Sequence, residues 1–170
     1  GRGVASSVAT GRGACGMEPS EIELKTLDEV LRRARLAAEE TGLAGIAAAV
    51  VLDDGILAYG ENQVHLDNDP TRHAEIVAIS RACHSVKRPD LTGATLVSSL
   101  QPCEMCLAAM RFAGIGRLLF AARQDNVAAK YFVFPGLRLP DFERADSEGF
   151  AARGGVCEHL VLDLYADGQE

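Results

Sequence analysis

Two short motifs constrain this chain more than any other feature of its sequence. His73-Ala74-Glu75 stands thirty positions before Pro102-Cys103-Glu104-Met105-Cys106. One imidazole and two thiols can hold Zn²⁺ while leaving the fourth position of its tetrahedron open. Structural zinc sites usually close that position with a fourth protein ligand, so an open site indicates catalysis. The fold must therefore bring two separate segments of the chain to one point.

The spacing within each motif suits that chemistry. Cys103 and Cys106 are three apart, which places both on one face of a helix, and the first turn of a helix favours thiolates. His73 and Glu75 are two apart and would diverge within a helix, so we expect His73 at the edge of a helical turn. Glu75 would take a proton from water held at the zinc and pass protons to a substrate ring nitrogen and leaving amine. This arrangement suits hydrolytic release of ammonia from an electron-poor carbon.

Each motif alone is weak, because Cys-x-x-Cys also occurs in redox sites and as half of a structural zinc site. Together, His-x-Glu and Pro-Cys-x-x-Cys form the signature of zinc-dependent deaminases. A zinc-stabilised scaffold or an inactive partner subunit remains as the non-enzymatic alternative.

Composition predicts one globular domain over residues 17–170, since 48% of the 170 residues are hydrophobic. Residues 1–16 are rich in Gly, Ser, Ala and Arg and lack the apolar centre of a signal peptide, which predicts a disordered tail or an expression remnant. No apolar run approaches the roughly 20 residues of a membrane span, so we expect no membrane partner. The cysteines outside the motif show no disulfide framework, which favours a reducing, cytoplasmic setting.

The pattern of apolar residues and turn signals predicts an α/β fold. A capping box at Ser20–Glu23 opens a helix that ends near Gly42, and Asp54-Gly55 marks a hairpin. Helices are also expected at 71–86, at 103–113 and near 141–148, an irregular aromatic segment at 125–139, and strands at 45–52, 56–60, 95–99, 117–122 and 159–164. Together they predict a three-layer α/β/α sandwich around a mixed five-stranded sheet.

Over about residues 24–164 the chain resembles the cytidine deaminase-like superfamily. The resemblance is most specific over Gly60–Asn62, Asn68–Ile76 and Ser99–Cys106. It implies the cytidine deaminase-like fold and a homodimer whose interface completes the pocket; the apolar stretch 117–134 could supply that surface. It also implies one zinc per subunit and these roles: His73, Cys103 and Cys106 as ligands, Glu75 as proton shuttle, Asn62 as a hydrogen-bonding partner of the substrate ring, and groups near Ala74 and Gln101 as pocket lining.

Two of these positions carry alternatives. Asn62 could instead be only a turn residue after its strand. Gln101 departs from the glutamate that is common before the proline of this motif, and we expect its side chain to face away from the substrate.

Within the superfamily, the chain resembles the branch of bacterial guanine deaminases, tRNA adenosine deaminases and fungal-type cytosine deaminases. Residues 68–79, followed by Arg81-Ala82-Cys83, look most like guanine deaminase. The net charge of −7 and the acidic C-terminal end, residues 158–170, argue against a nucleic-acid partner. We therefore expect a small nucleobase, guanine-like purine or related heterocycle, or its nucleoside; adenosine in tRNA and cytosine or cytidine are the alternatives.

The aromatic run Lys130–Gly136 has three interpretations: a hydrophobic plug, a dimer contact, or a lid that stacks on a planar ring. His65 and His84 are expected at the surface, and His159 could reach the pocket mouth. Cys83 and Cys157 are expected to be small buried hydrophobes rather than ligands.

Overall fold

The computed structural model describes residues 17–168, and it is built around a mixed five-stranded sheet of order β2-β1-β3-β4-β5. The strands are β1 (Ala47–Leu52), β2 (Gly55–Glu61), β3 (Ala94–Leu100), β4 (Arg117–Ala122) and β5 (Ala151–Arg153). β1 pairs antiparallel with β2 and β3, whereas β4 pairs parallel with β3 and β5. The predicted mixed sheet is confirmed. The expectation for residues 1–16 lies outside the described residues.

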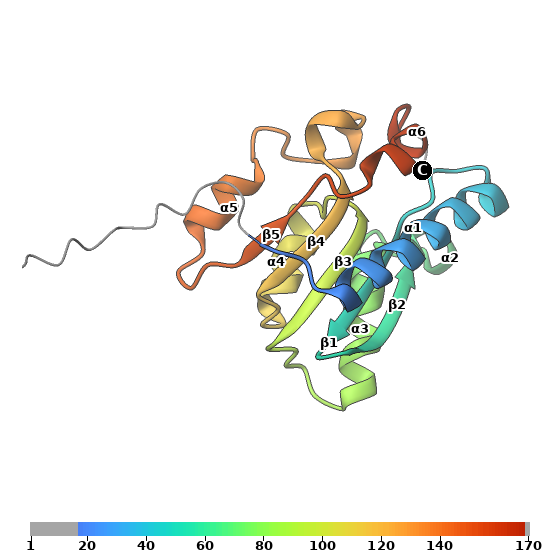
Figure 1. Cartoon of the computed structure of the whole chain (residues 1–170). Helices are drawn as coiled ribbons and strands as arrows, with labels where there is room; N and C mark the ends of the chain where they lie inside the picture. The colour runs from blue at the N-terminus through green and yellow to red at the C-terminus, as the bar shows by residue number, and fades with distance from the viewer. Residues whose placement is uncertain (1–16, 169–170) are drawn as a thin grey trace, which may run out of the picture.

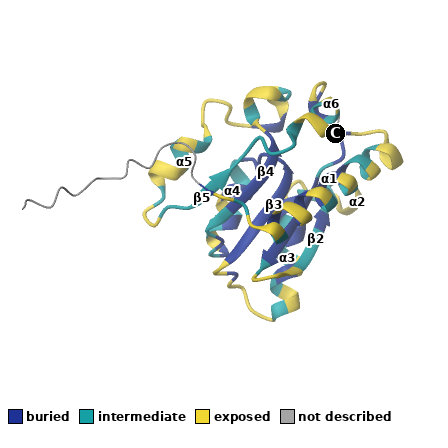
Figure 2. Ribbon diagram, in the orientation of Figure 1, coloured by how far each residue is buried: buried dark blue, intermediate teal, exposed yellow. Residues whose placement is uncertain are grey.

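Helices cover both faces of the sheet, which confirms the predicted three layers. α1 (Glu21–Thr41) lies across one face, while α3 (Ala74–Val86) and α4 (Glu104–Phe112) lie on the other (Figure 1). Each side has its own cluster of buried apolar side chains. The central strands are buried almost throughout, as Figure 2 shows. This rigid middle layer positions the helix starts that carry the two motifs.

The capping box expected at the start of α1 is present. The Glu23 N–H donates to Ser20 Oγ, and the Ser20 N–H donates to Glu23 Oε1. The helix ends at Gly42, whose φ of 70° is the left-handed conformation that glycine tolerates best.

Both motif-bearing helices begin later than a simple count of apolar residues suggests. α3 was expected from Thr71 but begins at Ala74, because Asp69 accepts hydrogen bonds from the backbone and hydroxyl of Thr71 and holds those residues in a turn. His73 is therefore the N-cap of α3, and Cys103 is the N-cap of α4.

The prediction of a last strand at 159–164 is wrong. That segment forms η3 (Glu158–Leu160) and α6 (Leu162–Tyr165), and the fifth strand is Ala151–Arg153. Val161 and Tyr165 are buried while Asp163 between them is exposed, which fits one face of a helix; in a strand all three side chains would share a face.

The connecting segments follow the remaining expectations with small shifts. The loop at 61–69 contains a single helical turn, α2 (Val64–Asp67), and the short helix expected near 141–148 is α5 (Leu139–Ala145). The irregular segment after β4 contains η1 (Gln124–Asn126) and η2 (Ala129–Tyr131). Within residues 17–168, no helix is both long and apolar enough to cross a bilayer.

Candidate active site

The three proposed metal ligands come together at the starts of two helices. His73 and Cys103 have extended backbone conformations as N-cap residues, and Cys106 lies in the first turn of α4. An N-cap side chain projects off the end of its helix rather than from its side, so His73 and Glu75 can face the same point despite their spacing. The expectation that His73 lies at the edge of a turn is confirmed.

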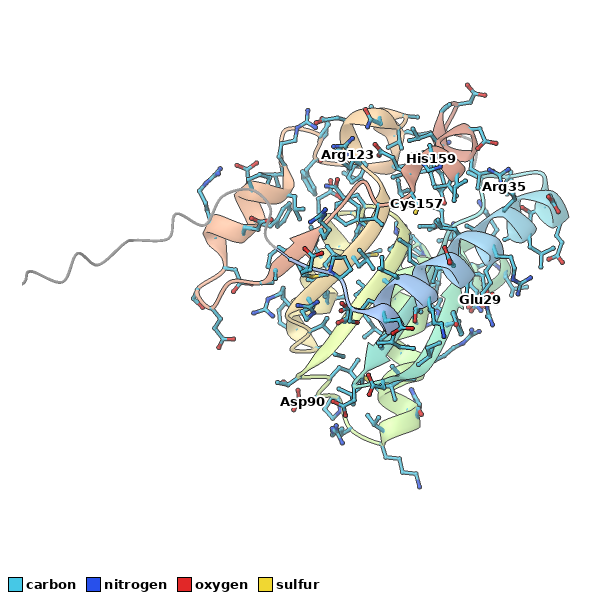
Figure 3. The ribbon with its side chains drawn as sticks, in the orientation of Figure 1. Glu29, Arg35, Asp90, Arg123, Cys157 and His159 are labelled. Atoms are coloured by element: carbon cyan, nitrogen blue, oxygen red, sulfur yellow. The ribbon has the colours of Figure 1, made fainter. Side chains whose placement is uncertain are left out.

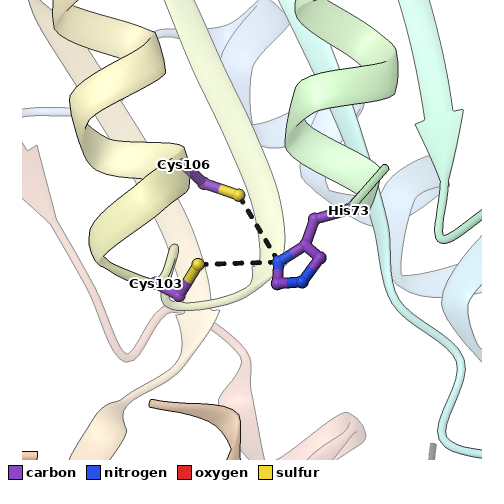
Figure 4. Close-up of side chains that lie close together, drawn as sticks. All are labelled: His73, Cys103 and Cys106. Atoms are coloured by element: carbon purple, nitrogen blue, oxygen red, sulfur yellow. Dashed lines mark hydrogen bonds between the residues drawn. The ribbon is translucent and has the colours of Figure 1, made fainter. Parts of the chain in front are cut away.

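The geometry of these side chains matches a tetrahedral zinc site. His73 Nδ1 lies 3.5 Å from Cys103 Sγ and 3.6 Å from Cys106 Sγ (Figure 4). A tetrahedral Zn²⁺ with ordinary bond lengths would separate a nitrogen and a sulfur ligand by about 3.6 Å. In the described part of the chain, this is the one group of three or more His, Cys, Asp or Glu side chains found to converge as a metal site. The residues present therefore fit zinc.

The electrostatics of the cluster also favour a cation. Hydrogen bonding from Cys106 lowers the pKa of the Cys103 thiol to about 4, against the opposing effect of burial. The pKa of Cys106 is raised, first by its hydrogen bond to Cys103 and then by burial. Burial and the neighbouring Cys103 also raise the pKa of Glu75. Three anionic groups would repel one another in a buried site, and a divalent cation removes that cost.

A narrow pocket with a cavity volume of about 20 Å³ opens beside the ligands. It is lined by Ile46, Asn62, His73, Ala74, Glu75, Leu100, Gln101, Cys103 and Tyr131. Glu75 is only 3% exposed, and Ser98 Oγ donates a hydrogen bond to its Oε1. The pocket thus presents a buried carboxylate beside a potential metal, which is the arrangement that proton transfer to a bound ring requires.

Asn62 lies on the pocket wall and is also a turn residue. Its Oδ1 accepts a hydrogen bond of 3.0 Å from the Val64 N–H. This contact fixes the side chain and leaves the amide N–H₂ as the group that can donate. The two interpretations of Asn62 are therefore compatible.

The side chain of Gln101 is engaged with the loop after β4. Its Oε1 accepts a hydrogen bond from the Gln124 N–H at 2.9 Å, and its Nε2 donates one to Gln124 Oε1 at 3.4 Å. A glutamate at this position could accept the first hydrogen bond but could not donate the second. Gln101 therefore ties the base of the pocket to η1, while Ala74 forms part of the pocket wall from the first residue of α3.

The side chains of the aromatic run Lys130–Gly136 differ in their burial. Tyr131 lines the pocket, Phe132 is buried in the core, and Val133 and Phe134 are 79% and 59% exposed. The Tyr131 ring packs edge-on against Tyr165, with 5.8 Å between ring centroids. Tyr165 is held in turn by donation from its hydroxyl to the Gly45 carbonyl at 2.7 Å. Sequence reasoning missed Tyr165, because its spacing from Val161 fits one face of a strand as well as one face of a helix.

The remaining candidates lie outside the pocket. His65 and His84 are exposed, as expected. His159 is exposed on η3 and is not among the lining residues (Figure 3). Cys83 and Cys157 are half-buried free thiols outside the ligand cluster. Ser98 was missed, because nothing in an apolar strand sequence marks one hydroxyl as a partner of Glu75.

Comparison with known proteins supports this assignment. Residues 21–122 match the model of the cytidine and deoxycytidylate deaminase zinc-binding region. The chain is 38% identical over 104 residues to the guanine deaminase of Bacillus subtilis, covering 59% of this chain and 67% of that one. It is 42% identical over 84 residues to the tRNA-specific adenosine deaminase of Agrobacterium fabrum, covering 49% and 55%.

The solved structures that resemble this chain include the same two classes of enzyme, tRNA deaminases and guanine deaminases. A structure from a study of A-to-I editing by tRNA:A34 deaminases superposes with a TM-score of 0.69 at 30% identity, covering 83% of this chain and 99% of that one. The guanine deaminase of Nitrosomonas europaea superposes with a TM-score of 0.71 at 27% identity, covering 87% and 84%. The fold is thus cytidine deaminase-like. With its converged ligand set and a family match over residues 21–122, the chain belongs to the cytidine and deoxycytidylate deaminase family of zinc-dependent deaminases.

Proposed function

We propose that this protein is an aminohydrolase that deaminates a small nucleobase, a guanine-like purine or related heterocycle, or its nucleoside, with release of ammonia. The observation that carries the proposal is the position of Glu75. Its buried carboxylate lies on the same pocket as His73 and Cys103, where a ring held at the metal would be within reach.

The side chains divide the work of this reaction. Zinc held by His73, Cys103 and Cys106 would make water nucleophilic at neutral pH. Glu75 accepts a proton from the attacking water and returns protons to the ring nitrogen and the departing amine. The Asn62 amide donates to the substrate ring, and Ala74 and Gln101 form the pocket around it. Tyr131, supported by Tyr165, supplies an aromatic wall for a planar ring.

Charge near the pocket supports a small substrate. Arg72, which precedes His73, is paired with Asp67, and Arg123, which precedes the Gln124 partner of Gln101, is paired with Glu158. An arginine already paired with a carboxylate is a poor partner for a nucleic-acid phosphate. Together with the net charge of −7, this favours a free heterocycle over tRNA.

The second candidate is adenosine in tRNA, because the tRNA-specific relative is 42% identical over its matched segment. It predicts inosine formation in an anticodon stem-loop and a basic groove beside the zinc site, and the pairing of Arg72 and Arg123 with acidic side chains counts against that groove. Cytosine and cytidine remain the third class of substrate to test.

The deciding experiment measures ammonia release by zinc-loaded protein from guanine, adenine, cytosine, their nucleosides and a triazine, and inosine formation in an anticodon stem-loop. We expect guanine or a related free heterocycle to be turned over fastest. Glu75→Gln should retain zinc and lose about 10²–10⁴-fold in kcat. The matched control is Glu104→Gln, because Glu104 bonds the Phe134 N–H and does not line the pocket. Turnover of the stem-loop alone would replace the proposal with the tRNA alternative, and no turnover of any substrate would remove both.

We further propose that the protein acts as a homodimer in the cytoplasm. Within the stretch 117–134, β4 supplies little of the dimer surface, because it lies inside the sheet and five of its six residues are buried. Exposed apolar side chains at Phe112, Val133 and Phe134 are better candidates, with Phe112 92% exposed. Cys83, Cys103, Cys106 and Cys157 are free thiols, which supports a reducing compartment. Light scattering of wild type and Phe112→Ser tests the assembly, and a wild-type monomer would refute it.

A further inference from the structure

Ser98 lies against Glu75 at the centre of the molecule. It is fully buried on β3, where its backbone pairs with Ala48 on one side and Phe120 on the other. Its Oγ lies 3.0 Å from Glu75 Oε1 and 2.7 Å from the Leu100 carbonyl oxygen. Because its strand is paired on both sides, the Ser98 backbone is held in place, and its hydroxyl can hold a catalytic group in position.

The hydroxyl has one proton and two acceptors, so it can donate to only one of them at a time. A proton shuttle alternates between carboxylate and carboxylic acid, and in a buried site each form needs a partner. When Glu75 is ionised, Ser98 can donate to Oε1. When Glu75 carries the proton, Ser98 can turn its own proton to the Leu100 carbonyl and accept from Glu75.

The other buried glutamate shows the contrast. Glu23 receives two N–H donors from Arg117, a hydroxyl from Thr95 and the Ser20 N–H. A guanidinium has no acceptor and cannot reverse its hydrogen bond, so Glu23 is held as a carboxylate. A glutamate with such partners would stay ionised and could not take up and release a proton during the reaction. A hydroxyl is a partner that suits both forms.

We propose that Ser98 is a positioning residue for Glu75, holding its carboxyl group toward the pocket in both protonation states by turning one hydroxyl between Glu75 and the Leu100 carbonyl. The inference rests on the proposed role of Glu75. The serine proton stays on its oxygen throughout, so no additional acid or base is required. The competing explanation is that Ser98 is a buried serine whose contact with Leu100 matters only for stability.

The test compares Ser98→Ala, Ser98→Cys and Ser98→Thr with wild type on the fastest substrate of the panel. Ala removes the donor, Cys keeps the approximate shape with a weak donor, and Thr keeps the hydroxyl. We expect Ala and Cys to lower kcat by about 10- to 100-fold, the range for a lost hydrogen bond to a charged group, with KM within about twofold. Thr should recover most of the loss. All three should keep the wild-type zinc content by elemental analysis.

Thr95→Val is the matched control, because it removes a buried hydroxyl on the same strand that also donates to a glutamate, Glu23, away from the pocket. It should lower the Tm and leave kcat unchanged. In the Glu75→Gln background, Ser98→Ala should cost no further rate, because there is no shuttle left to position. The two substitutions should also be non-additive in urea unfolding, which measures their contact without turnover.

The outcomes separate the two levels of the proposal. If wild type is active and Ser98→Ala has the same kcat, the positioning role is overturned and the proposed function stands. The positioning role is also overturned if Thr95→Val lowers kcat as much as Ser98→Ala does, or if Ser98→Ala loses activity because it loses zinc. If wild type turns over nothing, the proposed function fails and the positioning role fails with it.

Discussion

At the scale of single residues, the site depends on two helix N-caps. His73 and Cys103 occupy positions where serine, threonine or aspartate commonly satisfy free N–H groups. Neither makes a side-chain capping bond. Both side chains are directed to one point instead, where a metal can hold the two helix starts together.

The contribution of one ligand can be measured with Cys106→Ser. A serine hydroxyl is not ionised near neutral pH and is a poor zinc ligand, so we expect zinc content to fall to a small fraction of one per chain. The Tm of the purified protein should fall as well, because Cys106 is fully buried and zinc would link α3 to α4. Cys83→Ser is the control, since Cys83 lies on α3 outside the ligand cluster. A zinc content equal in both variants would contradict the ligand assignment.

At the scale of elements, close packing of α3 on β2 determines where the first motif lies. A Cβ atom on Gly60 would stand 2.4 Å from the Ala74 carbonyl oxygen and 2.6 Å from the Ala78 nitrogen. Both are backbone atoms of α3, so they cannot move without moving the helix. The absence of a side chain at Gly60 therefore lets the start of α3 approach the sheet.

Gly60→Ala should displace α3 and, with it, His73. We expect a lower Tm and at least about a tenfold loss in zinc affinity, measured by competition with a chelating dye, since small shifts of supporting groups commonly cost this much. Gly55→Ala on the same strand is the control, because its Cβ would meet only the Leu52 oxygen, at an ordinary 3.7 Å. Equal zinc affinity in the two variants would show that this packing does not govern the site.

A second link between elements joins α1 to β3 and β4. Burial alone would raise the pKa of Glu23, but hydrogen bonds from Arg117, the Ser20 N–H and Thr95 outweigh it and lower the pKa to about 2 from 4.5. A pKa that is lower in the folded state adds stability above the unfolded value and loses it as the pH falls. The stabilisation should therefore decline between about pH 5 and pH 2.

Glu23→Gln should lower the free energy of unfolding by about 2 kcal/mol at pH 7, a figure reduced for the partial exposure of Arg117. Its stability should also change less than that of wild type between pH 5 and pH 3 in urea titrations. Glu29→Gln removes a less buried carboxylate of the same helix, labelled in Figure 3, that also pairs with arginines, and it should cost much less. Similar losses in both variants would refute the special role of Glu23.

At the scale of the whole molecule, the net charge of −7 opposes the approach of a polyanionic substrate. A polyanionic substrate would be bound with a steep dependence on salt, because phosphate contacts release counterions. For a neutral heterocycle we expect KM to change less than about twofold between 50 and 300 mM salt. Steady-state kinetics on the fastest substrate measure this directly. A KM that rises steeply with salt would favour a phosphate-bearing substrate.

The zinc-ligand set, the deaminase family and most of the fold could be predicted from the sequence alone, whereas the acid–base role of Glu75 stays a prediction. These follow from local properties, because ligand chemistry depends on residue type and spacing, and strand or helix on the period of apolar residues. The last strand was placed wrongly, since a short run such as 159–164 is compatible with either period until its neighbours are known.

Which groups meet became visible only in the packed fold. Ser98 is a partner of Glu75 because β3 turns it toward the start of α3, and Tyr131 reaches the pocket because Tyr165 packs behind it from the end of the chain. Arg123, which precedes the Gln124 partner of Gln101, is paired with Glu158, an acid that lies far away in sequence. Such contacts depend on how separate segments pack, and packing between distant segments leaves no fixed spacing in the sequence.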